Sequence, residues 1–458
     1  DTGSIYTHNV SGTDDTATHN SAYGLTALDA ITTGDGNAAL GYGALGAVTT
    51  GPYNIAVGAY SGDSITTGSR NLAIGHGAYG GSDTENDNIA IGFNAMNVNT
   101  AGGTQNVAVG NYALDALTSG DYNVAVGHLA LSAQTTGTRN IAIGYQAMVT
   151  NTTSTENVAM GSYALKMNTT GDGNTAIGDA ALNANTTADN NTAIGNQTLK
   201  TNTTGANNTA VGREALYANT TGAENTALGA YALDANTTGS YSTAIGYNAL
   251  TANTTGENLG VGHSALAANT TGTDNTAVGR YGALMANTTG NYNTALGRSA
   301  LAANTTGTRN IAIGAEALDA SDTENDNIAI GYQAMTTNGT GAEYNIAIGN
   351  YSMDAAITGD GNVGVGHNTL TVDTSGWYNV AVGHQSMALN TTGAKNTALG
   401  ANTLEVNVDG DLNVAVGRNA LALNTGADNN VAVGSSAMAA NTTGGNNTAV
   451  GMNAMALN

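Results

Sequence analysis

The amino-acid sequence predicts an all-β fold, a parallel β-roll (β-solenoid) of about 26 coils with a 17-residue period. One phrase recurs with little variation between Gly161 and Gly256: Asn-Thr-Ala-Ile-Gly, two variable residues, Ala-Leu, and Asn-Thr-Thr-Gly. A fixed short period is typical of a solenoid, because one repeat cannot bury its apolar face alone. The glycines that close the first part of the phrase are a constant 17 residues apart, at Gly161, Gly178, Gly195, Gly212, Gly229 and Gly246.

Composition also indicates a thin solenoid. The chain has 64 Gly but one Pro, one Trp, one Phe and no Cys. Its apolar residues are mainly Ala, Val, Ile and Leu, which suit closely spaced layers better than a core built on aromatic rings.

The repeat sets the domain organisation. Residues 1–19 do not fit the phrase, and we interpret them as a cap, a linker or a joining segment. Residues 20–458 form one continuous solenoid, in which four steps take 18 or 16 residues; we expect these changes in turns or at strand edges. Asp1 is not an initiator and Asn458 falls within a phrase, so we expect a processed start, and further protein or another subunit after the last coil.

A slower repeat lies over the fast one. The sequence SDTENDNIAIG occurs at residues 82–92 and again, letter for letter, at residues 321–331. The offset of 239 residues continues loosely as residues 111–128 against residues 350–367. A block of 14 coils has therefore been duplicated, which suits a shaft whose length is free to grow.

The phrase also predicts the form of one coil. In Asn174–Gly178, Thr175 and Ile177 share one face of a strand, and Ala176 and the glycine share the other. The small face predicts a closely packed second strand, made by the Ala181, Leu182 and Ala184 segment. Asn185, Thr186 and Thr187 would form the return turn. Two strands per coil, with coils ~4.8 Å apart, would make a flattened roll.

The larger face of the strand predicts self-association. Ile177, Ile194, Val211 and Leu228 would form a continuous apolar stripe, which a soluble monomer avoids exposing. We expect the stripes of several chains to meet on a symmetry axis, most simply in a homotrimer. In the alternative, the stripe fills a wider single-chain solenoid and the Ala-Leu segment lies outside.

Charge excludes several classes of partner. Only 9% of residues are charged, yet the net charge is −23. Such acidity argues against nucleic acid and anionic lipid, which both require clustered Lys and Arg. No apolar run approaches the ~20 residues of a membrane helix, so we expect no membrane insertion. No nucleophile with a base and no carboxylate pair is distinct from the repeat, and we expect neither an enzyme nor a cofactor.

The candidates for metal binding are weak. Five of the seven histidines directly follow a repeat glycine, at a position that elsewhere holds Tyr, Asp, Arg or Asn, and we expect no metal there. Asp35, Asp172 and Asp360, each in an Asp-Gly-Asn turn, and the acidic run at residues 83–87 could bind a hard cation through oxygen atoms. Solvated turns are the simpler interpretation. The histidines are His8, His19, His76, His128, His263, His367 and His384.

The Asn-Thr-Thr turns allow two interpretations. Each matches the acceptor pattern for N-glycosylation, and sugars on them would coat the solenoid. Alternatively, Asn and Thr side chains stack and hydrogen-bond from coil to coil. The sites are Asn151, Asn168, Asn185, Asn202, Asn219, Asn236, Asn253, Asn269, Asn287, Asn304, Asn390 and Asn441.

Two further surfaces could bind ligands. A column of Thr such as Thr186 and Thr187 allows an ice- or crystal-binding interpretation, although adjacent residues point to opposite sides and leave one column per turn. Aromatic residues before the strand could stack on sugars. The adjacent Trp377 and Tyr378 are the strongest candidates for glycan contact. The other aromatic residues in this position are Tyr122, Tyr241, Tyr292 and Tyr344.

The strand phrase resembles a known repeat. Asn106–Gly110 reads Asn-Val-Ala-Val-Gly and Asn140–Gly144 reads Asn-Ile-Ala-Ile-Gly. Both are similar to the Ser-Val-Ala-Ile-Gly repeats of the YadA-like head in trimeric autotransporter adhesins, and to repeats of bacteriophage tail fibres. The resemblance covers roughly residues 20–458, with a longer period and Asn in place of the leading Ser. It implies a trimeric left-handed β-roll that acts in attachment outside the cell.

Together these observations predict a non-enzymatic extracellular fibre on a virion or cell surface, acting as a shaft or adhesin. Its partners would be other copies of itself, in a trimer or an end-to-end filament, and a cell-surface glycan or receptor. The alternatives are a glycan-coated filament with a purely mechanical role, and an ice- or surface-binding solenoid.

Overall fold

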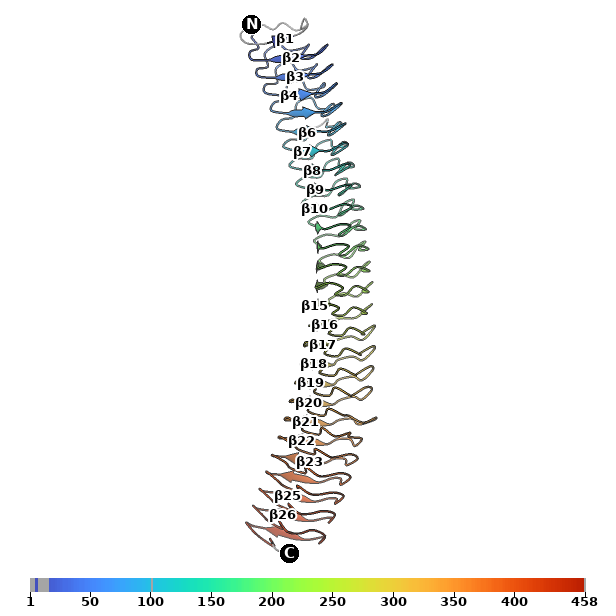
Figure 1. Cartoon of the computed structure of the whole chain (residues 1–458), viewed down its shortest axis with the longest axis vertical. Helices are drawn as coiled ribbons and strands as arrows, with labels where there is room; N and C mark the ends of the chain where they lie inside the picture. The colour runs from blue at the N-terminus through green and yellow to red at the C-terminus, as the bar shows by residue number, and fades with distance from the viewer. Residues whose placement is uncertain (1–4, 7–15, 100–101, 457–458) are drawn as a thin grey trace. The chain divides into compact units, whose positions relative to one another are not determined.

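The computed structural model describes residues 5–6, 16–99 and 102–456. The chain divides into two compact units, Asp1–Asn225 and Thr226–Asn458. Each unit is a parallel β-solenoid in which one short strand per coil lies beside the strand of the next coil (Figure 1). The predicted all-β class, solenoid architecture and 17-residue period are confirmed.

The strands of the first unit are three residues long, apart from the two-residue β1. They are β1 (Ile5–Tyr6), β2 (Ser21–Tyr23), β3 (Ala38–Leu40), β4 (Ile55–Val57), β5 (Leu72–Ile74), β6 (Ile89–Ile91), β7 (Val107–Val109), β8 (Val124–Val126), β9 (Ile141–Ile143), β10 (Val158–Met160), β11 (Thr175–Ile177), β12 (Thr192–Ile194) and β13 (Thr209–Val211).

The second unit continues the same series, with four residues in β16 and β17. Its strands are β14 (Thr226–Leu228), β15 (Thr243–Ile245), β16 (Asn258–Val261), β17 (Asn275–Val278), β18 (Thr294–Leu296), β19 (Ile311–Ile313), β20 (Ile328–Ile330), β21 (Ile346–Ile348), β22 (Val363–Val365), β23 (Val380–Val382), β24 (Thr397–Leu399), β25 (Val414–Val416), β26 (Val431–Val433) and β27 (Thr448–Val450).

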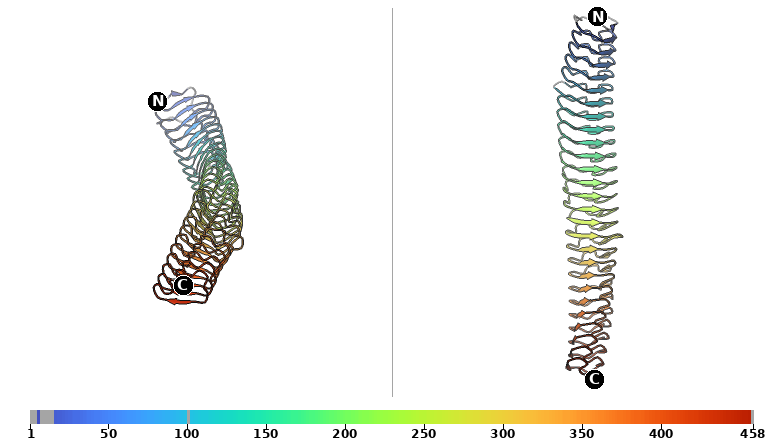
Figure 2. Two further views of the ribbon diagram at one scale, coloured as in Figure 1. Left: turned by 60° about the horizontal axis from the view of Figure 1, so that its bottom comes forward. Right: turned by 90° about the vertical axis from the view of Figure 1, so that its left-hand side faces the viewer.

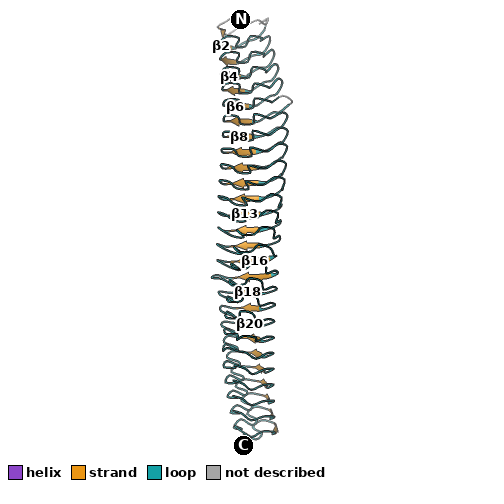
Figure 3. Cartoon of the chain, turned by 90° about the vertical axis from the view of Figure 1, so that its right-hand side faces the viewer, coloured by secondary structure: helices purple, strands orange, loops and turns teal. Residues whose placement is uncertain are grey.

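Equivalent residues of successive coils pair with one another. β11 pairs with β12 so that Thr175 lies beside Thr192 and Ala176 beside Ala193. The pairing of β1 with Ser21 and Ala22 carries the stack back beyond residue 20, into the segment expected to be a cap or linker. Within each unit the strands form one face of the coils, and loops form the rest (Figures 2 and 3).

Two of the long coils keep this register because their extra residue lies in a turn. Ile89 pairs with Val107 across an 18-residue step. The amide of Asn99 bonds to the carbonyl four residues ahead, whereas most equivalent asparagines bond three residues ahead, so the turn has absorbed the insertion. The duplicated block repeats this arrangement at Asn338. The expectation that turns absorb these changes is confirmed at these two coils.

The core of each coil is thin and made of small residues. Ala176, Ala181 and Leu182 are fully buried, whereas the outward residues of the strand, Thr175 and Ile177, remain partly exposed. The predicted assignment of the two strand faces is therefore confirmed. The alternative, with the aliphatic stripe inside and the Ala-Leu segment outside, is wrong, because the buried side chains are those of the Ala-Leu segment.

The return segment is not the second strand that the sequence indicated. Ala180 and Leu182 have left-handed φ angles of 52° and 51°, so the backbone cannot extend. Ala181 and Asn185 instead close turns by donating to the carbonyls of Gly178 and Leu182, both at 3.3 Å. Ala184, expected in the core, is half-buried. Small residues still pack against the strand, but through a chain of turns.

The repeat glycine is required where the strand ends. Gly178 has a φ of +134°, which L-residues rarely adopt. A Cβ atom on Gly178 would also overlap the carbonyl group of Gly195 in the next coil. The same approach recurs between Gly144 and Gly161, so the glycine column marks a close approach of successive backbones.

Candidate functional site

The outward face of the strands is a candidate surface in each unit. From Leu40 to Val450, every strand ends in Val, Ile, Leu or Met. Of the predicted stripe, Ile194 and Leu228 are 37% and 47% exposed, and Ile177 and Val211 are half-buried. In β4 to β10 the first strand residue is aliphatic as well, which makes the face two columns wide. In the single chain, an apolar sheet face is thus open to contact.

The asparagines considered for glycosylation lie in the core. All twelve have side chains that are no more than 2% exposed. In the central example, Asn185 Nδ2 donates to Asn168 Oδ1 at 2.9 Å and to the carbonyl of Ala188 at 3.0 Å. An N-linked glycan would occupy this Nδ2 and could not fit the packing. The alternative interpretation, an amide ladder between coils, describes these turns.

A second ladder runs through the asparagines that precede the strands. The backbone N–H of Asn191 donates to Asn174 Oδ1 at 2.9 Å, and Asn174 Nδ2 donates to the carbonyl of Ala188 at 2.9 Å. Both ladders therefore converge on one carbonyl, since Asn185 also donates to Ala188. The buried carbonyl of Ala188 is thus hydrogen-bonded to both ladders.

The turn threonines are part of the same scaffold. Thr186 Oγ1 donates to the carbonyl of Thr203 at 3.1 Å, and Thr203 Oγ1 donates to Thr220 at 2.9 Å. Thr187 is exposed beside them. Because the hydroxyl of Thr186 serves the next coil, this column is unsuited to ordering water for an ice-like lattice.

In the acidic run at residues 83–87, one carboxylate takes over the role of an asparagine that is missing from the ladder. Ser82 stands where most coils have Asn, and the carboxylate of Glu85 turns inward to accept from Ser82 Oγ at 2.6 Å. It also accepts the backbone N–H groups of Asp83, Thr84 and Gly102 at 3.0 Å. Burial alone would raise the pKa of Glu85, but these hydrogen bonds lower it. The carboxylate is thus a structural acceptor, and Glu324 repeats it in the second block.

The Asp-Gly-Asn turns also use their carboxylates within the fold. Asp35 Oδ1 accepts from the backbone and hydroxyl of Thr18, and Asp172 Oδ1 accepts from the backbone of Thr155 at 2.6 Å. Asp360 Oδ1 accepts from the backbone of Glu343 at 2.9 Å. Among the described residues, no group of three or more acidic or histidine side chains is placed to hold a metal ion.

A ladder of aromatic and imidazole rings was missed by the sequence analysis. Eight rings in successive coils of the first unit contact one another with centroids 5.2 to 6.2 Å apart. Most pairs meet edge to face, and His76 stacks on Phe93. The ladder consists of Tyr42, Tyr60, His76, Phe93, Tyr112, His128, Tyr145 and Tyr163.

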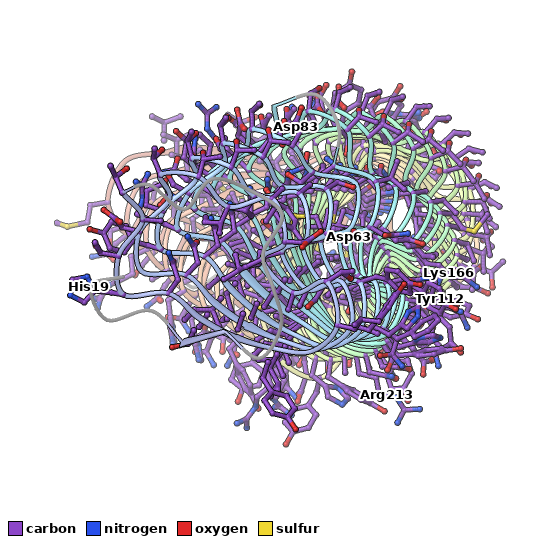
Figure 4. All side chains as sticks on the ribbon, turned by 90° about the horizontal axis from the view of Figure 1, so that it is seen from above. His19, Asp63, Asp83, Tyr112, Lys166 and Arg213 are labelled. Carbon is purple, nitrogen blue, oxygen red and sulfur yellow. The ribbon has the colours of Figure 1, made fainter. Side chains whose placement is uncertain are left out.

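Ring contacts of this kind involve five of the histidines, and His76 and His128 belong to the ladder itself. His263 stacks on Tyr247, and His367 stacks on His384 from the next coil at 5.5 Å with planes 6° apart. The position after the repeat glycine varies in residue type, and where it holds His the ring contacts a ring of a neighbouring coil. His19 is exposed and projects from the ribbon, as does Arg213 (Figure 4), and His8 lies outside the described residues.

Trp377 and Tyr378 form a separate aromatic site. Their rings meet at a centroid distance of 5.2 Å and an angle of 61°, and they are 42% and 59% exposed. They line a shallow hollow of about 270 Å³ together with Thr358, Gly359, Asp360 and Ser375. The other pre-strand aromatics, Tyr122, Tyr241, Tyr292 and Tyr344, are exposed by 54% to 60%.

No protein-family model, no curated protein and no solved structure matches the chain. The described residues contain no helix of the length and hydropathy needed to cross a bilayer.

Proposed function

We propose that the chain is a non-enzymatic structural fibre protein that acts outside the cell as a shaft or surface adhesin. Its solenoid units would assemble as a homotrimer through their aliphatic sheet faces. The observation that carries this proposal is the column of Val, Ile, Leu and Met at the strand ends, from Leu40 to Val211 in the first unit and from Leu228 to Val450 in the second. Large exposed apolar patches mark sites of association.

Several features support a mechanical role. In the central coils of the first unit, each coil bonds to its neighbours through the strand pairing, two amide ladders and the Thr column. The described carboxylates that sequence analysis considered for cation binding accept hydrogen bonds from the fold itself. A duplicated block of 14 coils extends the same scaffold. Strength along the stack is what such repetition provides.

The oligomeric state tests the assembly. The wild-type chain of 45.3 kDa should sediment as a species of three times that mass. A double variant, Ile141→Asp with Ile143→Asp, places two carboxylates on the outward face of β9 and should shift the mass towards the monomer. The control, Thr136→Asp, adds charge to an exposed turn position five residues before the same strand and should leave the mass unchanged.

Sedimentation of the folded wild-type chain as a monomer at all concentrations would disprove the assembly. Circular dichroism of each variant separates lost association from lost folding. Labelled antibody should decorate unbroken cells or particles of the source, and labelling only after lysis would contradict the extracellular role.

One observation favours a second candidate, an ice- or crystal-binding solenoid. In the first unit, Thr175, Thr192 and Thr209 form an in-register row on the outward sheet face, beside the aliphatic column. Regular spacing of hydroxyl and methyl groups on a flat face is suited to an ordered surface. A thermal-hysteresis measurement tests it, and freezing behaviour equal to that of an inert protein would exclude it.

A further inference from the structure

We infer that the corner between Trp377 and Tyr378 is a binding site for an uncharged pyranose sugar. The inference deepens the adhesin role and rests on it, because it supplies that role with a ligand class. It concerns the hollow between two successive coils, lined by Thr358, Asp360 and Ser375 in addition to the two rings.

The position of Tyr378 makes its ring a platform. The ring lies over Gly361 of the preceding coil so closely that a Cβ atom there would overlap it. Glycine at residue 361 therefore lets the ring pack on the backbone. With 59% of the residue exposed, the ring remains open to solvent. A flat apolar face of this kind packs against the C–H groups of a sugar.

Trp377 forms the wall of the corner. Lys395 Nζ lies 4.3 Å from the centre of its ring, so a cation from the next coil covers one indole face and helps to fix the side chain. The angle of 61° between the two rings leaves a concave edge that a single sugar ring could enter.

Polar groups at the base of the corner match sugar hydroxyls. Asp360 uses Oδ1 to accept the backbone N–H of Glu343, and a carboxylate has further acceptor capacity. Thr358 Oγ1 donates to the carbonyl of Thr374 at 2.8 Å, and Ser375 adds a second hydroxyl to the lining. A few fixed polar groups beside an apolar face are typical of ligand sites. Asp360 and the net charge of −23 disfavour an acidic sugar.

The duplicated block provides an internal comparison. At the offset of 239 residues, Ser119, Asp121 and Thr136 preserve the hydroxyls and the carboxylate of the corner. The two aromatic residues of the corner, and the glycine and lysine that pack against them, all differ from their counterparts in the other block. Gly361, Trp377, Tyr378 and Lys395 correspond to Tyr122, Thr138, Arg139 and Glu156.

These four differences are coordinated in the structure. The glycine makes room for the tyrosine ring, and the lysine covers the tryptophan. In the other block, Arg139 instead pairs with Glu156 at 3.0 Å. The aromatic ladder of the first unit is a poorer platform, because its rings cover one another's faces and edges. The corner is thus a local feature added to a common scaffold.

Intrinsic fluorescence tests the site directly, because Trp377 is the only tryptophan in the chain. The full-length protein is titrated with the methyl glycosides of glucose, galactose, mannose and N-acetylglucosamine, and with sialic acid. At least one neutral glycoside should change the emission saturably. Tyr378→Ala should weaken that binding at least tenfold, which corresponds to about 1.4 kcal/mol. The matched control, Tyr122→Ala, should leave it unchanged.

A second variant guards against an effect of misfolding. Gly361→Tyr with Trp377→Thr, Tyr378→Arg and Lys395→Glu gives the corner the residues of the other block, and should abolish binding measured by calorimetry while preserving the circular dichroism spectrum. No saturable response to any neutral glycoside, or a response to sialic acid alone, would overturn the inference. Retained trimer mass in that case would leave the shaft proposal standing, so the two failures are distinguishable.

Discussion

At the scale of single residues, the fold depends on side chains that serve two coils at once. Asn185 donates back to Asn168 and to its own turn at Ala188, and its Oδ1 accepts from Asn202 at 3.1 Å. Glu85 shows what happens when the amide is missing, because a carboxylate enters the core to fill the same role. Buried polar groups of this kind are costly only when left unpaired.

Replacing Asn185 with Ala should destabilise its coil by roughly 2–3 kcal/mol, because Asn202 Nδ2 and Asn168 Oδ1 lose a buried partner. Hydrogen exchange should therefore accelerate in the coils around residues 168–202. Thr187→Ala changes an exposed neighbour and is the control. Equal exchange in the two variants would show that the amide ladder adds nothing to stability.

Asp373 is a residue at which stability should depend on pH. It occupies a ladder position, and burial raises the pKa of its carboxyl to about 7, while Oδ2 has no hydrogen-bond partner. In the unfolded chain the pKa is 3.8. Between these values the folded state binds more protons, so the free energy of unfolding falls as pH rises through this window.

Asp373→Asn should remove that dependence. We expect the variant to be roughly 2–4 kcal/mol more stable than the wild type above pH 7, and about equal to it below pH 4. Hydrogen exchange or denaturant unfolding at both pH values measures the difference. A constant difference across the range would mean that Asp373 does not titrate in this window.

At the scale of the element, the coil combines an ordinary strand with an unusual return. The strand was predictable, since apolar alternation and a closing glycine define it. The return segment could not be predicted, because a left-handed φ at Leu182 costs about 1–2 kcal/mol and leucine does not favour that conformation. Packing of Leu182 in the core and its N–H bond to Thr198 at 2.9 Å offset this cost. Only the assembled stack reveals such a compensation.

Gly178→Ala should disrupt the strand end by 3 kcal/mol or more, about the cost of backbone strain combined with a steric overlap. The added methyl group would meet the carbonyl of Gly195, and φ at this position is +134°. Asp179→Ala, at the next and exposed residue, is the control. Thermal unfolding measures both, and equal melting temperatures would contradict the close approach of the backbones.

The ladder of rings and the amide core also differ in how far sequence could predict them. The Asn-Thr-Thr turns could be identified in the sequence, but the same motif is compatible with glycosylation at the surface and with a buried amide ladder. The rings were overlooked because Tyr42 and His76 directly follow the repeat glycine, whereas Tyr60 and Tyr112 come one residue later. Left-handed φ angles of 57° and 58° bring these two into line with the others.

At the scale of the whole molecule, repetition makes the coils interchangeable. Insertions in the turns at Asn99 and Asn338 leave the strand register intact, and a block of 14 coils occurs twice. Sequence alone predicted this property, since the period and the block offset can be counted. It could not identify the carbonyl of Ala188 as the point where two ladders meet.

Deleting residues 179–195, one complete coil, should give a folded protein with unchanged circular dichroism per residue, because Asn196 then follows Gly178 in the same phase of the phrase. Deleting residues 179–187, about half a coil, should unfold several neighbouring coils, because the inward and outward residues no longer align. Similar melting of the two deletions would refute the interchangeability of coils.

The amide ladder before the strands also has a direction. Asn174 Oδ1 accepts the backbone N–H of Asn191, and Asn191 Oδ1 accepts that of Asn208, so each of these coils presents a hydrogen-bond acceptor to the coil that follows it in the sequence. During synthesis, the coil that has already folded therefore presents an acceptor to the segment that leaves the ribosome next. Growth of the native structure can therefore keep pace with translation, one rung at a time, without waiting for a distant segment.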